Sequence, residues 1–281
     1  MTTDGTQAAG EQPVDSSTED EHPTFDTSVA HIARVYDYWL GGKDNYAADR
    51  RAGDEAIQSY PDMASSVRAN REFLARAVRY LAAEAGIRQF LDIGTGIPTA
   101  NNTHEVAQSV APDSRVVYVD NDPIVLAHAR ALLTSSPQGV TDYIDADLRD
   151  TETILARAAR SLDFSRPVAI MLIAILHVIS DDDHPYQIVA KLIDAVPPGS
   201  YLALSHVASD IEPDKVAETR KRLNRLMYQK GTYRSHDQVA RFFGGLDMIE
   251  PGVVVVPQWR PDSDLEANRP TVMWGGVGRK S

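Results

Sequence analysis

Apolar positions recur at helical spacing in the part of the chain that precedes the first strand signal. Within residues 31–40 the apolar side chains form one helical stripe, and two glycines at positions 41 and 42 provide an end signal. The same pattern predicts two further helices, over residues 45–59 and 63–85. Residues 27–86 are therefore expected to form an N-terminal helical cap.

From residue 89 onwards, short apolar runs alternate with helical patterns. The runs predict strands over residues 89–93, 115–119, 141–144, 168–176 and 200–206. Helices are expected between them, over residues 103–110, 123–134, 151–161 and 184–196. The fourth run is apolar at every position instead of alternating, which indicates a strand buried on both faces. Strands that alternate with helices at this spacing predict a mostly parallel, doubly wound α/β sheet.

The C-terminal part of the chain departs from this alternation. Helices are expected over residues 212–229 and 235–244, and Ser235 with Gln238 forms a capping-box signature for the second. Two strands follow, over residues 252–256 and 271–277, and the absence of a helix between them predicts an antiparallel hairpin. Together with the five parallel strands, they predict a seven-stranded, Rossmann-like domain over residues 87–281.

The composition is that of a globular protein and excludes several kinds of chemistry. Hydrophobic residues make up 43% of the 281 positions and charged residues 24%. No apolar run reaches the roughly 18 residues that a membrane span needs, so no membrane partner is expected. The chain has no cysteine, which excludes disulfides, thiol nucleophiles and cysteine-bound zinc. The N-terminus lacks the regions of a secretory signal, and a cytoplasmic location is expected.

The net charge of −12 is unevenly distributed along the chain. Residues 1–26 contain seven acidic side chains and no Lys or Arg, so they are expected to form a disordered acidic tail. A solubilising leader is the favoured role for this tail, and an interaction segment is the alternative. The other 255 residues carry the remaining −5. Such a surface lacks the basic footprint that a phosphate backbone needs, so nucleic acid is not expected as a partner.

The segment Leu-Asp-Ile-Gly-Thr-Gly, residues 91–96, lies where the first strand turns into its helix. Ligands of open α/β sheets bind beyond the carboxyl ends of the strands, close to this position. Gly94 and Gly96 let the backbone turn around Thr95 and approach a ligand, and Asp92 can accept hydrogen bonds from an ammonium group. A dinucleotide fingerprint would need a third glycine at position 99, which is Thr. Alone, the segment indicates a nucleotide-type turn, and a plain strand–turn–helix is the alternative.

Acidic residues also follow the second strand. Asp120 stands 26 positions after Gly94, where a carboxylate can accept two hydrogen bonds from a ribose diol. Its neighbour Asn121 is included in the predicted cofactor site. Asp122 precedes Pro123 at the start of the next helix, so it is assigned to capping, although it is the alternative ribose ligand. Both NAD and S-adenosylmethionine contain such a ribose.

The pair Asp147-Leu148 after the third strand distinguishes the two cofactors. It resembles the adenine clamp of methyltransferases, in which Asp147 would accept from the exocyclic amine and Leu148 would pack against the ring. NAD-binding folds do not regularly require an acidic and an apolar residue at this position. The Asp-x-Gly-x-Gly form of residues 92–96 likewise resembles methyltransferase motif I, although Pro98 stands where that motif often has a glycine. The three elements in this order favour S-adenosylmethionine.

A closer resemblance lies in the N-terminal block Ala-Arg-Val-Tyr-Asp-Tyr-Trp-Leu-Gly-Gly-Lys-Asp-Asn-Tyr-Ala-Ala-Asp-Arg, residues 33–50. It resembles the hallmark of a bacterial S-adenosyl methyltransferase family that was first catalogued as a domain of unknown function. Residues 91–103, 118–123 and 242–256 are similar to other blocks of that family. The resemblance covers residues 27–279 and implies a Rossmann-like class I methyltransferase fold with a helical lid. It implies no particular acceptor.

His177 follows the fourth strand, where such folds often place residues that face the acceptor. It is the candidate catalytic residue, a general base for an oxygen or nitrogen acceptor. A histidine hydrogen-bonded beneath the cofactor or within its own loop is an equally good interpretation. Tyr36, Tyr38, Trp39 and His206 are further candidates for the acceptor pocket, although aromatic residues at helical spacing more often belong to a core.

The acceptor is expected to be a small molecule. Residues 174–177, Ala-Ile-Leu-His, stand where many base- and amide-methylating enzymes carry Asn-Pro-Pro-Tyr, and the surface is acidic. No metal is expected, because the acidic run 181–183 precedes a helix, where carboxylates serve as caps.

Two other functions are alternatives. The first is a non-catalytic S-adenosylmethionine-binding sensor or interaction module. The second, an NAD-dependent oxidoreductase, is disfavoured by Thr99 and Asp147-Leu148. The sequence indicates no oligomeric state.

Overall fold

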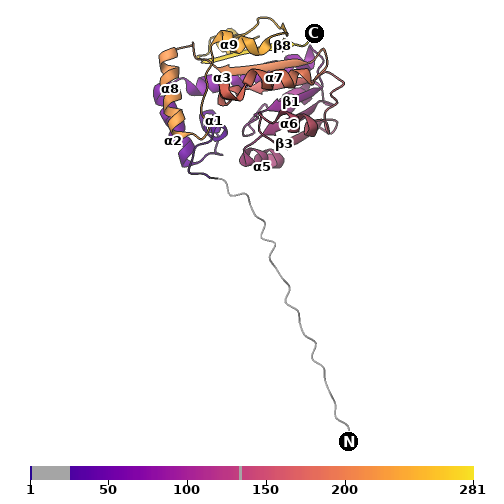
Figure 1. Ribbon diagram of the computed structural model, residues 1–281, viewed down its shortest axis with the longest axis horizontal. Coiled ribbons are helices and arrows are strands. Elements are labelled where there is room, and N and C mark those ends of the chain that lie inside the picture. The colour runs from indigo at the N-terminus through magenta and orange to yellow at the C-terminus, as the bar shows by residue number, and fades with distance from the viewer. Residues whose placement is uncertain (2–25, 133–134) are drawn as a thin grey trace.

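A single eight-stranded sheet organises the molecule (Figure 1). The computed structural model describes Met1 and residues 26–132 and 135–281, so the predicted acidic tail lies almost wholly outside the described residues. The strand order is β3-β2-β1-β4-β5-β8-β6, and β7 also pairs with β8. The strands are β1 (Gln89–Ile93), β2 (Arg115–Asp120), β3 (Val140–Asp145), β4 (Ala169–Ile173), β5 (Tyr201–Val207), β6 (Asp247–Met248), β7 (Val254–Val255) and β8 (Met273–Arg279). Strands β1 to β5 pair in parallel and β8 is antiparallel, which confirms the predicted Rossmann-like arrangement.

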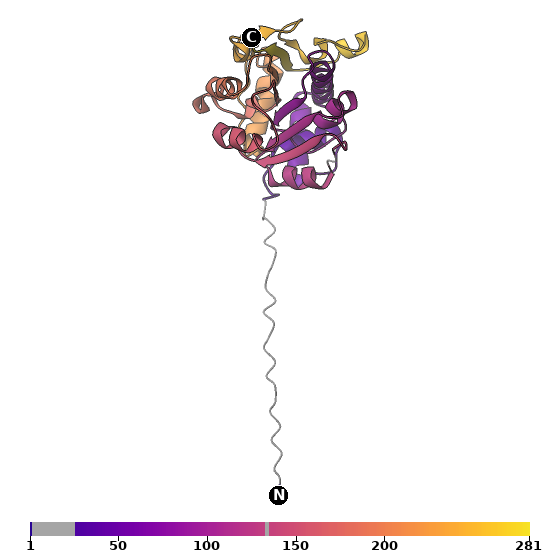
Figure 2. The ribbon, with the colours of Figure 1, turned by 90° about the vertical axis from the view of Figure 1, so that its right-hand side faces the viewer.

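Helices cover both faces of the sheet, as Figure 2 shows. One face carries α6 (Thr151–Ala158), α7 (Pro185–Asp194), α9 (His236–Ala240) and the 3-10 turn η3 (Arg241–Phe243). The other carries α3 (Met63–Ala83), α4 (Thr103–Val110) and the 3-10 turn η4 (Val256–Gln258). Ile170 and Leu172 of β4 belong to the first core, and Met171 and Ile173 belong to the second. The uninterrupted apolar run of β4 is thus explained by burial on both faces, as predicted.

A third apolar cluster lies beside the sheet. It joins α1 (Ile32–Leu40) and α2 (Ala47–Ser59) to α8 (Pro213–Leu226), which is far away in the sequence. Figure 1 shows α2 and α8 side by side at one edge of the molecule. Of the three helices in residues 27–86, α3 therefore packs on the sheet, whereas α1 and α2 pack with α8. A domain boundary at residue 86 stays a prediction.

Two strand predictions differ from the structure. The sheet has eight strands instead of seven, because β6 forms at Asp247–Met248, ahead of the predicted strand over residues 252–256, and β7 occupies only Val254–Val255 of that predicted strand. Strand β4 ends at Ile173 instead of residue 176. Ala174 adopts the left-handed conformation, with φ 53°, and the chain leaves the sheet into the 3-10 turn η1 (Leu176–Val178). The remaining elements are α5 (Pro123–Leu132), η2 (Asp181–Asp183) and α10 (Asp264–Ala267).

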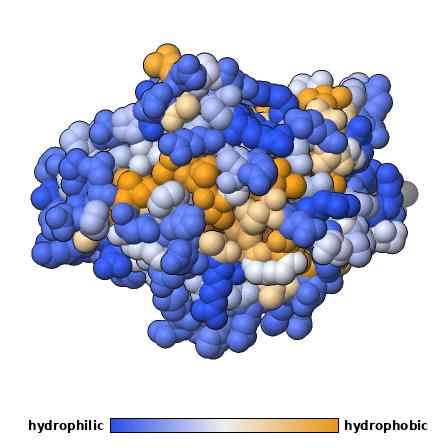
Figure 3. Space-filling model, turned by 90° about the horizontal axis from the view of Figure 1, so that it is seen from above, coloured by the Kyte–Doolittle hydropathy of each residue, from blue (hydrophilic) through white to orange (hydrophobic). Residues whose placement is uncertain are grey.

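The end of the molecule that carries α9 and β8 has an apolar centre. Figure 3 looks onto this end and shows apolar side chains gathered within a rim of polar ones. Here the last long strand, β8, is paired on its outer side by strands of only two residues, β6 and β7. Among the helices that the structure describes, none has the length and apolar character needed to cross a membrane.

Candidate functional site

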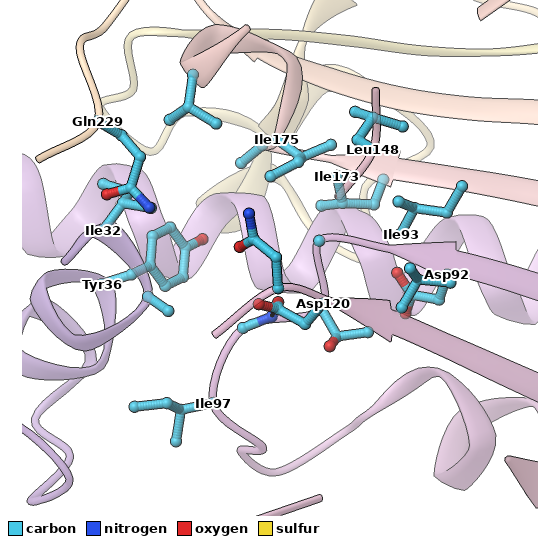
Figure 4. A pocket seen from close by; sticks show the side chains of 18 of the residues that line it. Ile32, Tyr36, Asp92, Ile93, Ile97, Asp120, Leu148, Ile173, Ile175 and Gln229 are labelled. Carbon is cyan, nitrogen blue, oxygen red and sulfur yellow. Dashed lines mark hydrogen bonds between the residues drawn. The ribbon is translucent and has the colours of Figure 1, made fainter. Parts of the chain in front are cut away.

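A cavity, called the cofactor cavity below, opens between α1 and the carboxyl ends of β1, β2 and β4. All eight residues predicted to bind the cofactor line it: Asp92, Gly94, Thr95, Gly96, Asp120, Asn121, Asp147 and Leu148. In Figure 4, Asp92 lies at one end, Asp120 lies near the middle, and Ile32 and Tyr36 of α1 lie at the other end. The parallel sheet brings these segments together because their strands end at the same edge.

Two glycines in the left-handed region shape the turn after β1. Gly94 has φ +76°, and a Cβ added to it would lie 2.4 Å from Cγ1 of Ile175. Gly96 has φ +64°, and a Cβ added there would meet no atom within 4 Å. The backbone N–H of Gly94 donates to the carbonyl of Val119 at 2.8 Å, which ties the turn to β2. Close packing therefore requires Gly94, whereas Gly96 leaves open space beside the cavity.

Asp92 places a buried carboxylate at the end of β1. Its side chain accepts a hydrogen bond from the hydroxyl of Thr103 at 2.6 Å, and the residue is 4% exposed. Burial raises the pKa of Asp92 to about 6, although the Thr103 hydrogen bond and the positive charge of Arg71 act in the opposite direction. A buried carboxylate is stabilised by an approaching cation, so Asp92 is suited to an ammonium group.

Asp120 at the end of β2 connects two turns. Its Oδ2 accepts from the N–H of Gly96 and its Oδ1 from the N–H of Asp122, both at 2.9 Å. Burial raises the pKa of this carboxyl, while the two backbone hydrogen bonds lower it. Each carboxylate oxygen has a second lone pair, so Asp120 can accept two further hydrogen bonds, as a ribose diol requires.

Asp122 has a different role from its neighbour. Its Oδ1 accepts from the N–H of Ile124 at 2.9 Å and so caps the start of α5. Its other oxygen lies 2.8 Å from Nδ1 of His31, the residue that precedes α1. Although burial acts to raise it, the pKa of Asp122 is held below its ordinary value by the contact with His31. Asp122 therefore attaches the start of α1 to the turn that follows β2.

Asp147 and Leu148 form another wall of the cofactor cavity. Oδ2 of Asp147 accepts from Nδ2 of Asn121 and from Nη1 of Arg149, both at 3.0 Å. Its Oδ1 accepts from the backbone N–H of Arg149 at 2.9 Å. Leu148 is buried, with 5% exposure. The protein thus positions a half-exposed carboxylate next to a buried apolar side chain.

The cofactor cavity is also lined by residues that were not predicted from the sequence to bind the cofactor. They include His31, Ile32, Tyr36, Asn70, Arg71 and Gln229. The hydroxyl of Tyr36 accepts from Nδ2 of Asn70 at 3.0 Å and donates to the carbonyl of Val67 at 3.1 Å. Of these residues, only Tyr36 was predicted from the sequence to have a role, as a candidate for the acceptor pocket. The others lie on separate helices and loops and carry no local motif.

His177 does not line the cofactor cavity. It lies on η1 and lines another cavity under the N-terminal helices, called the second cavity below. Its side chain is buried, and Nδ1 has no hydrogen-bond partner among the described residues. Burial and the nearby charge of Arg234 lower the pKa of His177 to about 4, so its imidazole is neutral at pH 7. The predicted catalytic residue is therefore separated from the predicted cofactor residues.

Arg234 fixes the segment that carries His177. Its guanidinium is 1% exposed and donates to the carbonyls of Leu176 and Ile179 and to Oδ1 of Asp181. It also lies 2.8 Å from Nε2 of His206. Because a guanidinium only donates, this Nε2 must accept, and the His206 proton resides on Nδ1. Within the described residues, no group of three or more His, Asp or Glu side chains is placed to hold a metal ion.

The cofactor cavity fits the cofactor that the sequence predicts. S-adenosylmethionine combines an amino acid end, a ribose diol and an adenine ring. The cavity provides a buried carboxylate at Asp92, a second with free lone pairs at Asp120, and open space beside Gly96. Its remaining walls include the apolar side chains of Ile97, Leu148, Ile173, Ile175 and Val178.

Known proteins are similar to this chain in sequence and fold. Residues 18–281 match the model of a family described as S-adenosyl methyltransferase. A DUF574-family protein from Streptomyces avermitilis is 47% identical, with a TM-score of 0.88 over 91% of this chain and 99% of that chain. A candidate methyltransferase from Thermobifida fusca is 44% identical, with a TM-score of 0.83 over 91% of this chain and 96% of that chain. Among curated proteins, no significant match is found.

Proposed function

This chain belongs to the S-adenosyl methyltransferase family, and from that premise we propose that it transfers the methyl group of S-adenosylmethionine to a small-molecule acceptor. The family match favours methyl transfer over the two alternative functions, the sensor and the oxidoreductase. One observation supports the proposed site above all: the eight cofactor residues chosen from the sequence line one cavity covered by α1. A covered cavity and a body with a net charge of −5 suit a small acceptor better than a nucleic acid.

The methionine end of the cofactor is assigned to Asp92 and Arg71. Asp92 would accept from the ammonium group, because its buried carboxylate is stabilised by a positive charge. Arg71 lines the same cavity, and its Nε is buried without a hydrogen-bond partner in the described structure. A guanidinium with a free donor is suited to the carboxylate of an amino acid.

The nucleoside end is assigned to the ends of β2 and β3. Asp120 would accept from the ribose diol with the lone pairs that Gly96 and Asp122 leave free. Asp147 would accept from the adenine amine, and Leu148 would pack against the ring. Asn121 holds the Asp147 carboxylate by its hydrogen bond at 3.0 Å.

When bound, the cofactor supplies a methyl group on a positively charged sulfur, which an acceptor atom displaces in line. The chain contributes positioning and the exclusion of water. His31 fastens the start of α1 to Asp122, so that Ile32 and Tyr36 cover the cavity. A catalytic role for His177 stays a prediction: the neutral imidazole can accept a proton, but its lowered pKa makes it a weak base.

Titration calorimetry with S-adenosylhomocysteine tests the cofactor assignment. Asp120→Ala should raise the dissociation constant about 100-fold, because two charge-assisted hydrogen bonds are worth about 3 kcal/mol. Asp145→Ala is the matched control, since Asp145 is the register partner of Asp120 on β3, is exposed and does not line the cavity. Absence of binding to the unmodified protein, or equal losses in both variants, would contradict the assignment.

The acceptor class needs a separate experiment. The protein is incubated with S-adenosylmethionine carrying an isotope-labelled methyl group and with a cell extract that contains both small and large molecules. The label should enter products of low molecular mass. Label in protein or nucleic acid would contradict a small-molecule acceptor. Cofactor binding without any transfer would favour the non-catalytic sensor.

A further inference from the structure

The second cavity has uncharged, mainly apolar walls. They come from α1, α3, α8 and the ends of β5 and β8, and they include Trp39, Met63, Val67, Val216, Leu223 and Met273. No Asp, Glu, Lys or Arg is among the described residues that line it. Burying a charge without a partner is costly, so an occupant of this cavity must be neutral and largely apolar.

Two fully buried polar atoms on these walls lack a hydrogen-bond partner within the described part of the chain: Nδ1 of His177 and the hydroxyl of Tyr60. The two residues are 6% and 1% exposed. Buried polar groups in folded proteins are almost always paired, so two unpaired groups on one cavity require an explanation. The hydroxyls of Tyr36, Ser66 and Thr219 on the same walls are all hydrogen-bonded. A ligand with polar atoms would pair the remaining two.

The second cavity adjoins the cofactor cavity. Ile32 and Tyr36 line both, and Figure 4 shows them at the end of the cofactor cavity that is opposite Asp92. The η1 region also divides the two spaces, because Ile175 and Val178 line the cofactor cavity whereas His177 lines the second. Ile32 and Tyr36 thus form a wall that the two cavities share, and a molecule in the second cavity comes into contact with the cofactor where these side chains move aside.

We propose that the second cavity binds the methyl acceptor, and that this acceptor is a neutral planar aromatic alcohol whose hydroxyl hydrogen-bonds to Nδ1 of His177. The assignment rests on the proposed function and gives its small-molecule acceptor a chemical class. The rings of Trp39, Tyr60 and Tyr233 on the walls suit a planar aromatic molecule. Because the imidazole is neutral, its unpaired nitrogen can accept from a hydroxyl.

Methylation of such an acceptor conserves atoms and electrons. Methylation exchanges the O–H bond of the alcohol for an O–CH3 bond, and the donor sulfur keeps the electron pair of the broken carbon–sulfur bond. The released proton has Nδ1 of His177 as its first acceptor, from which it passes to solvent. The hydroxyl of Tyr60 is a donor for a second polar atom of the same molecule.

A pair of probes that differ by one hydroxyl tests the assignment. Binding of 2-naphthol and of naphthalene is measured by fluorescence on the full chain saturated with S-adenosylhomocysteine. The 2-naphthol should bind about tenfold more tightly, the effect of one buried hydrogen bond. His177→Leu should abolish this difference and leave naphthalene binding unchanged. Equal affinity of the two probes for the unmodified protein would overturn the proposal.

A substitution that fills the second cavity provides the second test of the proposal. Val216→Phe, on the cavity wall, should weaken both probes by about tenfold or more, because an added ring leaves less room. Leu226→Phe is the matched control on the same helix, at a residue that does not line the cavity. Binding that survives Val216→Phe, or losses of the same size in both variants, would show that the probes bind elsewhere.

Thermal unfolding distinguishes a ligand-binding His177 from a structural one. Removal of an unpaired buried nitrogen should leave the Tm of His177→Leu unchanged or higher, whereas loss of a structural histidine would lower it.

Calorimetry with S-adenosylhomocysteine on the same samples separates the two proposals. Cofactor binding without 2-naphthol binding contradicts the acceptor site alone. Absence of cofactor binding contradicts the proposed function, and the probes are then compared on the free protein.

Discussion

The cofactor cavity and the second cavity share α1 as a wall and differ in how they are built. The first is formed largely by turns at the ends of parallel strands, with the carboxylates Asp92 and Asp120 next to glycines. The second is formed mainly by side chains of α1, α3 and α8 and has no charged lining among the described residues. The backbone of a sheet edge thus provides a site for a charged nucleoside, whereas helix packing provides a site for an apolar molecule.

Burial shifts the pKa of one titratable residue in each cavity, and the two shifts have opposite directions. It raises the pKa of Asp92 to about 6 and lowers that of His177 to about 4, because it disfavours the charged form of each group. Asp92 is therefore stabilised in its charged form by a cation, whereas His177 keeps a neutral nitrogen for a neutral partner. The comparison indicates that each cavity selects the charge of its own ligand.

The largest effect is expected from the residue that fixes the segment between the cavities. Arg234→Leu would leave two carbonyls and Nε2 of His206 without their donor, and should lower the free energy of unfolding by about 3 kcal/mol. Chemical denaturation measures this change. Arg241→Leu is the control, since Arg241 is exposed and stacks on Tyr186, and should cost less than about 1 kcal/mol. Similar losses in the two variants would show that Arg234 does not hold the dividing segment.

A smaller effect tests whether close packing of the backbone shapes the cofactor cavity. Gly94→Ala should lower the free energy of unfolding by about 2 to 3 kcal/mol, because it combines a left-handed backbone with overlap against Ile175. Gly86→Ala provides the matched control, with φ +70° and no atom within 4 Å of the added Cβ. It should cost only about 1 kcal/mol. Equal values would mean that contact with Ile175 does not matter.

The charge of Asp92 predicts that ligand affinity depends on pH in the cofactor cavity and not in the second cavity. A bound ammonium favours the carboxylate, so affinity for S-adenosylhomocysteine should fall as the pH drops below the raised pKa of about 6. Between pH 7 and pH 5 the loss should be about tenfold. Asp92→Asn should bind weakly and show a flat profile in calorimetry. For the free protein, lowering the pH has the opposite effect on the free energy of unfolding. Protonation of Asp92 below pH 6 relieves the cost of burying its charge and so adds stability.

The smallest effect is expected at the exposed rim of the cofactor cavity. Arg149 pairs with Asp147, and the two side chains are 47% and 34% exposed. Solvent-exposed ion pairs contribute less than about 1 kcal/mol, so Arg149→Gln should change the dissociation constant less than about fivefold. Arg157→Gln, which removes an exposed arginine bound to the Asp145 carbonyl, should leave binding unchanged. A loss as large as that of Asp120→Ala would place the main recognition at the rim.

The sequence alone determined the sheet, and it predicted the residues that line the strand-end side of the cofactor cavity. Alternating strands and helices predicted the parallel sheet, and the segments at Gly94–Gly96, Asp120 and Asp147 predicted its ligand-facing turns. This was possible because each segment combines its chemistry with its strand end in a few consecutive residues. A parallel sheet then places those ends at one edge, whatever the details of packing.

Only the tertiary structure decided the cap side and the position of His177. The contact of His31 with Asp122 and the inclusion of Arg71 and Tyr36 in the cofactor cavity depend on how helices pack across the end of the sheet. His177 was predicted from its place after β4, but the left-handed turn at Ala174 and the hydrogen bonds of Arg234 place it at the second cavity. Contacts between side chains of distant segments leave no local pattern in the sequence, because only the folded chain brings them together.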